Sequence, residues 1–153
     1  MSYWLMKSEP STFGIEHLER AKSRTTGWDG VRNFQARNYL REMKKGDLAF
    51  FYHSSCEVPG IAGIVSVARE AYPDPTAFDA KHDHYDADSD PADPRWFMVD
   101  VKLVKKLDRV VTLEQLRAHA GGKLKNMIVL KRGNRLSITP VTKSEWDFIT
   151  SLE

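Results

Sequence analysis

The sequence predicts one α+β domain built around a small curved sheet or barrel. The chain has 153 residues, close to the usual size of a single domain and too few for two comfortable ones. Its apolar runs have uneven lengths and are interrupted by short helical patterns, without the regular alternation of strand and helix that a parallel sheet requires. The sequence contains no internal repeat, so we expect residues 1–153 to fold as one unit.

The first third of the chain predicts a strand followed by two helices. Residues 3–7 have the aromatic and apolar character of a short strand, and residues 11–14 form a turn that leads into a short helix. Asn33 then suits a helix N-cap, and apolar side chains at near-helical spacing continue to Met43, where a Lys-Lys-Gly-Asp sequence ends the pattern. The segment 33–43 is the clearest helix in the sequence.

The rest of the chain predicts further strands, two helices and one long loop. Continuous or alternating patterns of β-branched and aromatic residues predict strands of a buried sheet at residues 48–52, 61–68 and 96–107. Residues 127–130 are a further strand candidate. Helices are expected at residues 112–116, where a Thr cap precedes an acidic first turn, and at 142–152. The Asp- and Pro-rich stretch 72–94 is expected to be a loop inserted between strands.

The charge of the chain is small but unevenly distributed. The formal net charge is +2, from 23 basic and 21 acidic residues. Between Asp74 and Asp100 eight Asp stand against Lys81 and Arg95, a local charge of −6, which leaves +8 for the remainder. A mostly basic surface favours phosphates, although a solvated surface of mixed charge is the simpler alternative. Charge therefore gives some support to a nucleic-acid partner.

Composition also indicates the compartment. No run of about eighteen apolar residues is present, and the first residues lack the zones of a signal peptide, so we expect neither a membrane protein nor a secreted one. A single cysteine, Cys56, allows no internal disulfide and no thiolate metal cluster, which fits a reducing compartment. We therefore expect a cytoplasmic protein.

The acidic loop contains part of a calcium-binding pattern. Asp86, Asp88 and Asp90 match the first three ligand positions of a calcium-binding loop. However, Pro91 stands where that loop needs glycine for its turn, and Phe97 stands where it needs a bidentate glutamate. The sequence therefore predicts a solvated acidic loop.

Three other motifs give no better case for chemistry. His82 and His84 could share one face of a strand, but two imidazoles without a further clear ligand are poor evidence for zinc. Residues 53–56 place a histidine near Cys56 without an acidic group to orient the histidine, so we expect a packed cysteine. The glycines at 60 and 63 match no phosphate-binding loop. We expect no metal and no cofactor.

The densest group of polar and aromatic residues lies early in the chain. Lys7, Ser8 and Glu9 end the first strand ahead of Pro10, and residues 28–38 place an indole, two arginines and several amides before a helix. A base edge is read by hydrogen bonds, its face by stacking, and its phosphate by Arg, Lys or a helix N-terminus. This group predicts a base-binding site. The alternative is an ordinary core tryptophan, an ordinary helix cap and an exposed basic face.

A series of short motifs continues along nearly the whole chain. They are YWLMKSEP at 3–10, WDGVRN at 28–33, QARN at 35–38, FYHS at 51–54, PGIAG at 59–63, PRW at 94–96, VDV at 99–101, RLS at 135–137 and PV at 140–141. In this order and combination the sequence resembles the EVE domain proteins. The resemblance implies a PUA-like fold, a mixed β-barrel with flanking short helices, similar to the YTH domains that hold a methylated adenine.

The resemblance also implies a function and a set of site residues. Family members read modified bases, notably modified cytosine in DNA, or modified bases in RNA, without catalysis. Carried onto this chain, the base-binding residues would be Lys7, Ser8, Trp28, Asn33, Tyr52, His53 and Ser54. Trp28 would stack on the base while Ser8 and Asn33 bind its edge. The residues toward the nucleic-acid backbone would be Arg32, Gln35 and Arg37. The acidic loop is then expected on a different face, since it would repel phosphate.

Two other functions remain open from the sequence. One is an enzyme acting on a nucleotide or small ligand, in which Lys7, Glu9 and His53 carry out acid–base chemistry. The other is a protein-interaction domain that keeps the fold without a polar pocket. A non-catalytic nucleic-acid binding module is our prediction.

Overall fold

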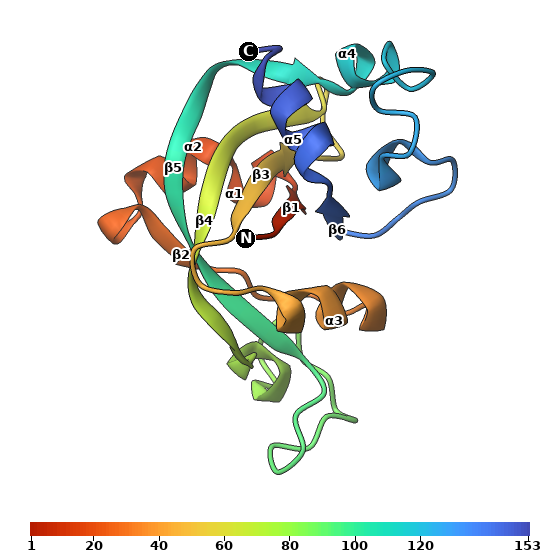
Figure 1. Ribbon diagram of the computed structural model, residues 1–153. Coiled ribbons are helices and arrows are strands. Elements are labelled where there is room, and N and C mark those ends of the chain that lie inside the picture. The colour runs from red at the N-terminus through yellow and green to blue at the C-terminus, as the bar shows by residue number, and fades with distance from the viewer.

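Six strands form one mixed sheet in the computed structural model, which describes all 153 residues (Figure 1). Their order across the sheet is β2–β5–β4–β3–β1–β6. The strands are β1 (Tyr3–Ser8), β2 (Thr25–Gly27), β3 (Leu48–His53), β4 (Gly60–Pro73), β5 (Phe97–Thr112) and β6 (Ile138–Val141). Strand β1 pairs in parallel with β3 and antiparallel with β6, and the other pairs are antiparallel.

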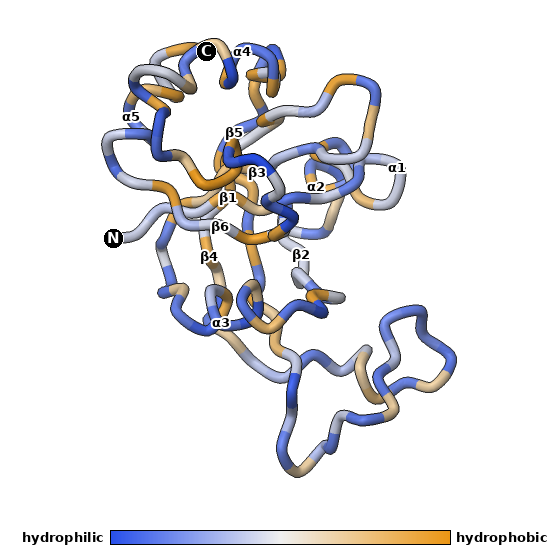
Figure 2. Tube along the Cα trace, turned by 90° about the vertical axis from the view of Figure 1, so that its right-hand side faces the viewer, coloured by the Kyte–Doolittle hydropathy of each residue, from blue (hydrophilic) through white to orange (hydrophobic).

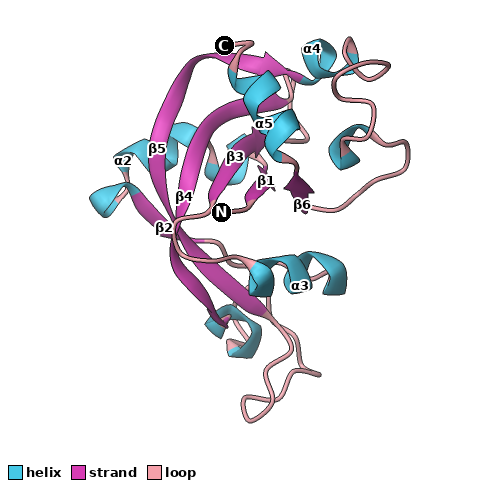
Figure 3. Cartoon of the chain, viewed as in Figure 1, coloured by secondary structure: helices cyan, strands magenta, loops and turns pink.

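Short helices lie around this sheet, as the cartoon in Figure 3 shows. The α-helices are α1 (Pro10–Phe13), α2 (Ile15–Arg20), α3 (Phe34–Glu42), α4 (Leu113–Arg117) and α5 (Lys143–Thr150). Single 3-10 turns occur at η1 (Lys22–Arg24), η2 (Pro75–Phe78) and η3 (Ile128–Leu130). No helix is long and apolar enough to span a membrane.

The two faces of the sheet bury separate sets of apolar side chains, because successive residues of a strand point to opposite faces. Phe51 of β3 lies in one core with Trp28 and the residues of α2 and α3. Its neighbour Phe50 lies in the other core, where its ring stacks on Trp146 of α5 at 3.9 Å between ring centroids. Figure 2 shows the hydrophobic stretches gathered in the sheet. Helices therefore cover both faces.

Strands β4 and β5 form a long bent ribbon that runs past the sheet toward the acidic loop (Figure 1). Their pairing shifts register at four points, and such bulges bend a strand pair and increase its twist. Gly63 sits at one of these shifts, where an added Cβ would lie 2.6 Å from Ile15 Cδ1 and 2.8 Å from Lys105 O. The glycine allows α2 to pack closely on the ribbon.

The structure corrects the predicted secondary structure in several short segments. Residues 127–130, predicted as a strand candidate, contain the 3-10 turn η3 instead. Buried Met127 anchors this turn in the core, and a short apolar run has the same pattern whether it is a strand or a buried turn. Strands β2 and β6 were not predicted, because three and four residues carry little periodicity. Pro140 is tolerated in β6 because that strand lies at the sheet edge.

Candidate functional site

A cleft of about 640 Å³ opens where β1 ends and α1 begins, a size typical of small-molecule sites. We call it the β1–α1 cleft. Four segments line it: the end of β1, helix α1, the end of β2 with the residues after it, and the acidic loop. Its lining residues are Lys7, Ser8, Glu9, Thr12, Phe13, Thr26, Gly27, Trp28, Asp29, Gly30 and His84.

Local hydrogen bonds fix α1 over the end of β1. Pro10 occupies the first turn of α1, where the missing N–H costs nothing. The Ser8 hydroxyl donates to the Phe13 carbonyl at 2.6 Å, and the Ile15 N–H donates to His53 Nε2 at 3.1 Å. These bonds hold the wall that carries Phe13 against the strand end. His53 therefore supports the wall and does not line the cleft.

Trp28 belongs mainly to the core and contributes a small part of its surface to the cleft lining. Its backbone N–H donates to Val99 O at 2.7 Å, and its ring packs edge-on against Phe51 at 5.4 Å. Only 8% of the residue is exposed. The predicted stacking on Trp28 would thus use the exposed remainder of a ring whose position the core determines.

Asp74 joins the segment after Trp28 to the acidic loop. Its carboxylate, which is fully buried, accepts hydrogen bonds from the Gly30 N–H at 2.9 Å and from Arg32 at 3.1 Å. Burial opposes the charge of Asp74, but hydrogen bonds from Thr76, Gly30 and Arg32 outweigh it and hold the pKa below its usual range. Arg32 also donates to the His84 carbonyl at 2.7 Å. Its guanidinium is therefore engaged within the protein.

The acidic loop lies against the cleft and not on a different face, which corrects the sequence-based expectation. The ring of His84 packs on Gly30, where an added Cβ would meet His84 Cε1 at 2.4 Å. Gly30 also has φ = +78°, in the left-handed region that favours glycine. The expectation was based on repulsion between the acidic loop and phosphate. However, hydrogen bonds from Gly30 to Asp74 and from Arg32 to the His84 carbonyl fix this part of the loop. The loop therefore places His84 in the cleft lining.

Lys7 brings a positive charge to the cleft. The residue is half-buried, and this burial lowers the pKa of its amine. Its Nζ atom lies 6.0 Å from the centroid of the Tyr52 ring. Tyr52 is the residue of β3 that pairs with Lys7 of β1. Tyr52 is only 3% exposed, and burial, the largest cause, raises the pKa of its phenol. Tyr52 thus lies behind Lys7 and outside the cleft lining.

The other predicted site residues lie outside the cleft lining, on or near α3 or directly after β3. Asn33 Oδ1 accepts from the Ala36 N–H at 3.0 Å and caps the helix. Arg37 donates to the Arg95 carbonyl and to the Asn38 side chain. Gln35 is exposed, and Ser54, which follows β3, donates its N–H to Ser8 O. Of the predicted base-binding residues, the structure places Lys7, Ser8 and Trp28 in the cleft.

The sequence interpretation missed several lining residues. Asp29 and Gly30 lie in a motif that had been singled out, but no role was given to them. Phe13 was placed only in a turn. His84 had no local signal linking it to the others, because it is 54 positions from Gly30 and the contact exists only in the folded chain. The length of the acidic loop was the single indication that this region has a role.

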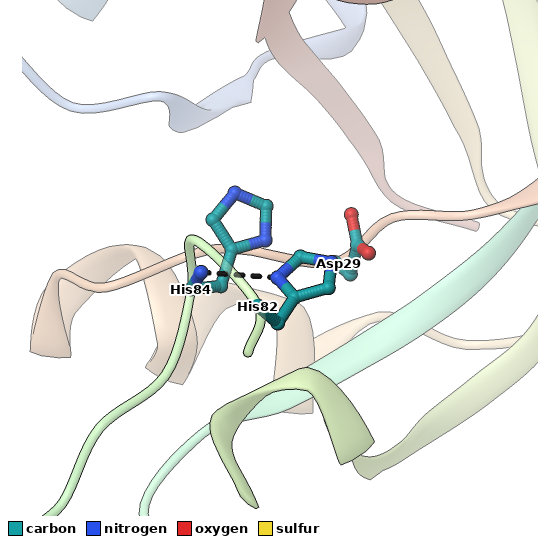
Figure 4. A group of neighbouring side chains, drawn as sticks. All are labelled: Asp29, His82 and His84. Atoms are coloured by element: carbon teal, nitrogen blue, oxygen red, sulfur yellow. Dashed lines mark hydrogen bonds between the residues drawn. The ribbon is translucent and has the colours of Figure 1, made fainter. Parts of the chain in front are cut away.

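Asp29, His82 and His84 could hold a divalent cation, since one ligand atom from each lies within 4.8 Å of the others (Figure 4). Asp29 supplies the third ligand that the sequence did not place beside the two histidines. The Nδ1 atom of His84 is buried and has no hydrogen-bond partner. However, His82 Nδ1 accepts from the His84 N–H at 3.0 Å, so a neutral His82 carries its proton on Nε2. Metal binding through either nitrogen of His82 would break this bond.

Comparisons with known proteins agree with the fold and point to a family. The sequence model of the EVE domain matches residues 2–152. Thymocyte nuclear protein 1 of Homo sapiens is 48% identical over 167 residues, covering 99% of this chain and 74% of that protein. Several solved structures are also similar.

Three of these structures show how far the similarity extends. The crystal structure of the human THYN1 protein in complex with 5-methylcytosine-containing DNA has a TM-score of 0.95 and 48% identity, over 99% of this chain and 97% of that one. A Pseudomonas putida protein has a TM-score of 0.92 and 47% identity, over 99% of both chains. The Mmi1 YTH domain, with a TM-score of 0.56 and 12% identity over 99% of this chain and 86% of that one, shares the fold alone. The predicted α+β, PUA-like fold is confirmed.

Proposed function

The chain belongs to the EVE domain family, and on that premise we propose that it is a non-catalytic module that binds DNA and takes a modified cytosine into the β1–α1 cleft. The observation that carries this proposal is the composition of the cleft wall. Apolar surface from Trp28 and Phe13 lies beside the charged groups of Lys7 and Asp29. The complex of the human THYN1 protein with 5-methylcytosine-containing DNA supports the choice of base.

The polar groups of the cleft suit the edge of cytosine. The cytosine N4 amine is a donor, which Asp or Glu can accept, and Asp29 and Glu9 are exposed carboxylates in the cleft lining. The Lys7 ammonium is a donor for the acceptors of the same base. The exposed part of Trp28 and the ring of Phe13 supply apolar surface for the base face and for a 5-methyl group.

A base in duplex DNA reaches such a cleft only after it leaves the helical stack. Extrusion costs a few kcal/mol, which stacking on aromatic side chains and hydrogen bonds to the base edge offset. The cleft walls are held by buried groups, since Trp28 is part of the core and buried Asp74 joins the segment after Trp28 to the acidic loop. A wall that is fixed before binding loses little conformational entropy when the base enters.

The positions of the candidate acid–base residues Lys7, Glu9 and His53 favour a binding role over catalysis. Lys7 and Glu9 line the cleft, but His53 does not. His53 Nε2 accepts the Ile15 N–H, so its neutral form carries the proton on Nδ1. Burial, the largest cause, lowers the pKa of His53, which keeps it neutral in this supporting role. The three groups are therefore not gathered around one reacting position.

The proposal is tested by fluorescence anisotropy with matched duplexes that carry cytosine, 5-methylcytosine or thymine at one position. We expect the 5-methylcytosine duplex to bind best. In Asp29→Asn, the preference for 5-methylcytosine over thymine should fall by about fivefold to tenfold, because a hydrogen bond to a charged carboxylate is replaced by a weaker one to the neutral amide oxygen. The matched control is Asp83→Asn, which removes the same charge from an exposed position outside the cleft lining.

Three outcomes would overturn the proposal. Equal binding of the three duplexes by the wild type would remove the modified base as the ligand. Equal effects of Asp29→Asn and Asp83→Asn would remove Asp29 from the recognition site. A single-stranded RNA with 5-methylcytosine belongs in the same titration, and tighter binding of that RNA than of the methylated duplex would also contradict the proposal.

A further inference from the structure

A basic segment without any acidic residue precedes β6. Residues 117–135 contain six basic side chains and no Asp or Glu. All six are exposed, and none takes part in an ion pair or in a side-chain hydrogen bond within the protein. They are Arg117, Lys123, Lys125, Lys131, Arg132 and Arg135. These charges are therefore uncompensated, unlike those of Arg32 and Arg95, which pair with aspartates.

The basic segment has a defined backbone. Leu124 and Met127 are each only 1% exposed and anchor it in the core beneath α5. Between these anchors and β6, the Asn134 side chain donates to Ile128 O at 3.1 Å and accepts from the Leu136 N–H at 3.1 Å. The basic side chains thus project from a framework that the core and these bonds hold in place.

The segment leads into β6, which pairs with β1 beside the β1–α1 cleft. At the C-terminal end, Ser137 O accepts the Lys7 N–H at 2.8 Å, which places Arg135 two residues from the partner of a cleft residue. In Figure 1 the acidic loop, drawn in green, lies at the opposite end of the molecule from this segment, drawn in blue.

A base-binding cleft needs a nearby surface that holds the nucleic-acid backbone, because phosphate contacts supply most of the non-specific affinity. Two of the residues first expected to make these contacts, Arg32 and Arg37, donate instead to protein groups around Asp74 and Arg95. The basic segment has free donors, contains no acidic residue, and leads to Ser137, whose carbonyl accepts the Lys7 N–H.

We infer that the basic segment is the surface that holds the phosphates of the DNA whose base enters the cleft, so that the strand runs on the Lys7 side and away from the acidic loop. This inference rests on the proposed function, because it assigns the backbone contacts of that same complex. It also orients the DNA on the molecule. The base points toward Trp28 and Asp29, while the flanking phosphates follow the segment that leads into β6.

The test measures the salt dependence of DNA binding in two charge-matched double variants. Lys131→Gln/Arg132→Gln removes two charges from the basic segment, and Lys44→Gln/Lys45→Gln removes two from the exposed turn between α3 and β3. Each lost phosphate contact reduces the slope of log Kobs against log salt by about 0.9. The first variant should therefore flatten the slope by up to about 1.8, with an equal loss of affinity for methylated and unmethylated duplexes. The control should keep the wild-type slope, and thermal unfolding confirms that both variants fold.

The failure of this inference can be distinguished from failure of the proposed function. If both double variants have the wild-type slope while the methylcytosine preference persists, the basic segment does not hold the backbone and the cleft proposal survives. If the slope falls only in Lys131→Gln/Arg132→Gln, the backbone surface is established, and it stands even where the wild type shows no base preference. A selective loss of methylcytosine binding in this variant would contradict the inference, because phosphate contacts carry no base information.

Discussion

Gly30→Ala should reshape the β1–α1 cleft by displacing the ring of His84. Two separate effects add at this position. Gly30 has φ = +78°, where an alanine is strained, and an added Cβ would lie 2.4 Å from Cε1, 2.6 Å from Nε2 and 2.7 Å from Nδ1 of His84. The control is Gly133→Ala, because Gly133 has φ = +79° and no atom lies within 4 Å of its added Cβ.

The two effects have different sizes and can be separated. The left-handed backbone alone costs an alanine about 1–2 kcal/mol, which both variants share. Overlap with a packed ring adds about 1–3 kcal/mol, so Gly30→Ala should lose about 2–5 kcal/mol of unfolding free energy. For a domain of this size the melting temperature should then fall by about 5–15 °C, against about 5 °C for the control.

Thermal unfolding and 5-methylcytosine binding together check this prediction. Gly30→Ala should weaken binding of the methylated duplex by an order of magnitude, roughly 1.4 kcal/mol, while Gly133→Ala should keep the preference for the methylated base. In a His84→Ala background, Gly30→Ala should lower the free energy of unfolding only as much as Gly133→Ala does, since the His84 ring is no longer present. Equal destabilisation by the two glycine variants in the wild-type background would refute the packing of His84 on Gly30.

Two further predictions concern residues that support the cleft. Asp74→Asn should cost about 2 kcal/mol at neutral pH, because Arg32 loses its buried partner. The pKa of Asp74 is lowered in the folded state, so this contribution is present above the unfolded value of 3.8 and is lost as the pH falls from there through the lower pKa of the folded state. In urea unfolding, a wild-type advantage that is the same at pH 7 and pH 3 would contradict the assignment. Asn33→Ala should cost about 1 kcal/mol through loss of the α3 cap, and Asn33→Asp should retain that stability. Neither Asn33→Ala nor Asn33→Asp should alter the preference for methylcytosine. A folded Asn33→Asp variant that loses the preference would show that the Asn33 side-chain amide contacts the base.

The sequence determined the fold class, most elements and one wall of the cleft. Long strands such as β4 and β5 carry enough apolar periodicity to be recognised, and Asn33 marked the start of α3 because a side-chain cap is a local interaction. Lys7, Ser8 and Trp28 were found because they lie in motifs close to strand ends and because the chain resembles a known family.

Only the tertiary structure decided how distant segments meet. The acidic loop could not be placed from the sequence, because its position depends on buried Asp74 bonding to Gly30 and Arg32, more than 40 residues away. The same long-range packing assigned Tyr52 to the core and His84 to the cleft. Local residue patterns indicate the conformational and burial preferences of single segments. Which group forms a hydrogen bond with a buried polar group depends on the folded chain as a whole.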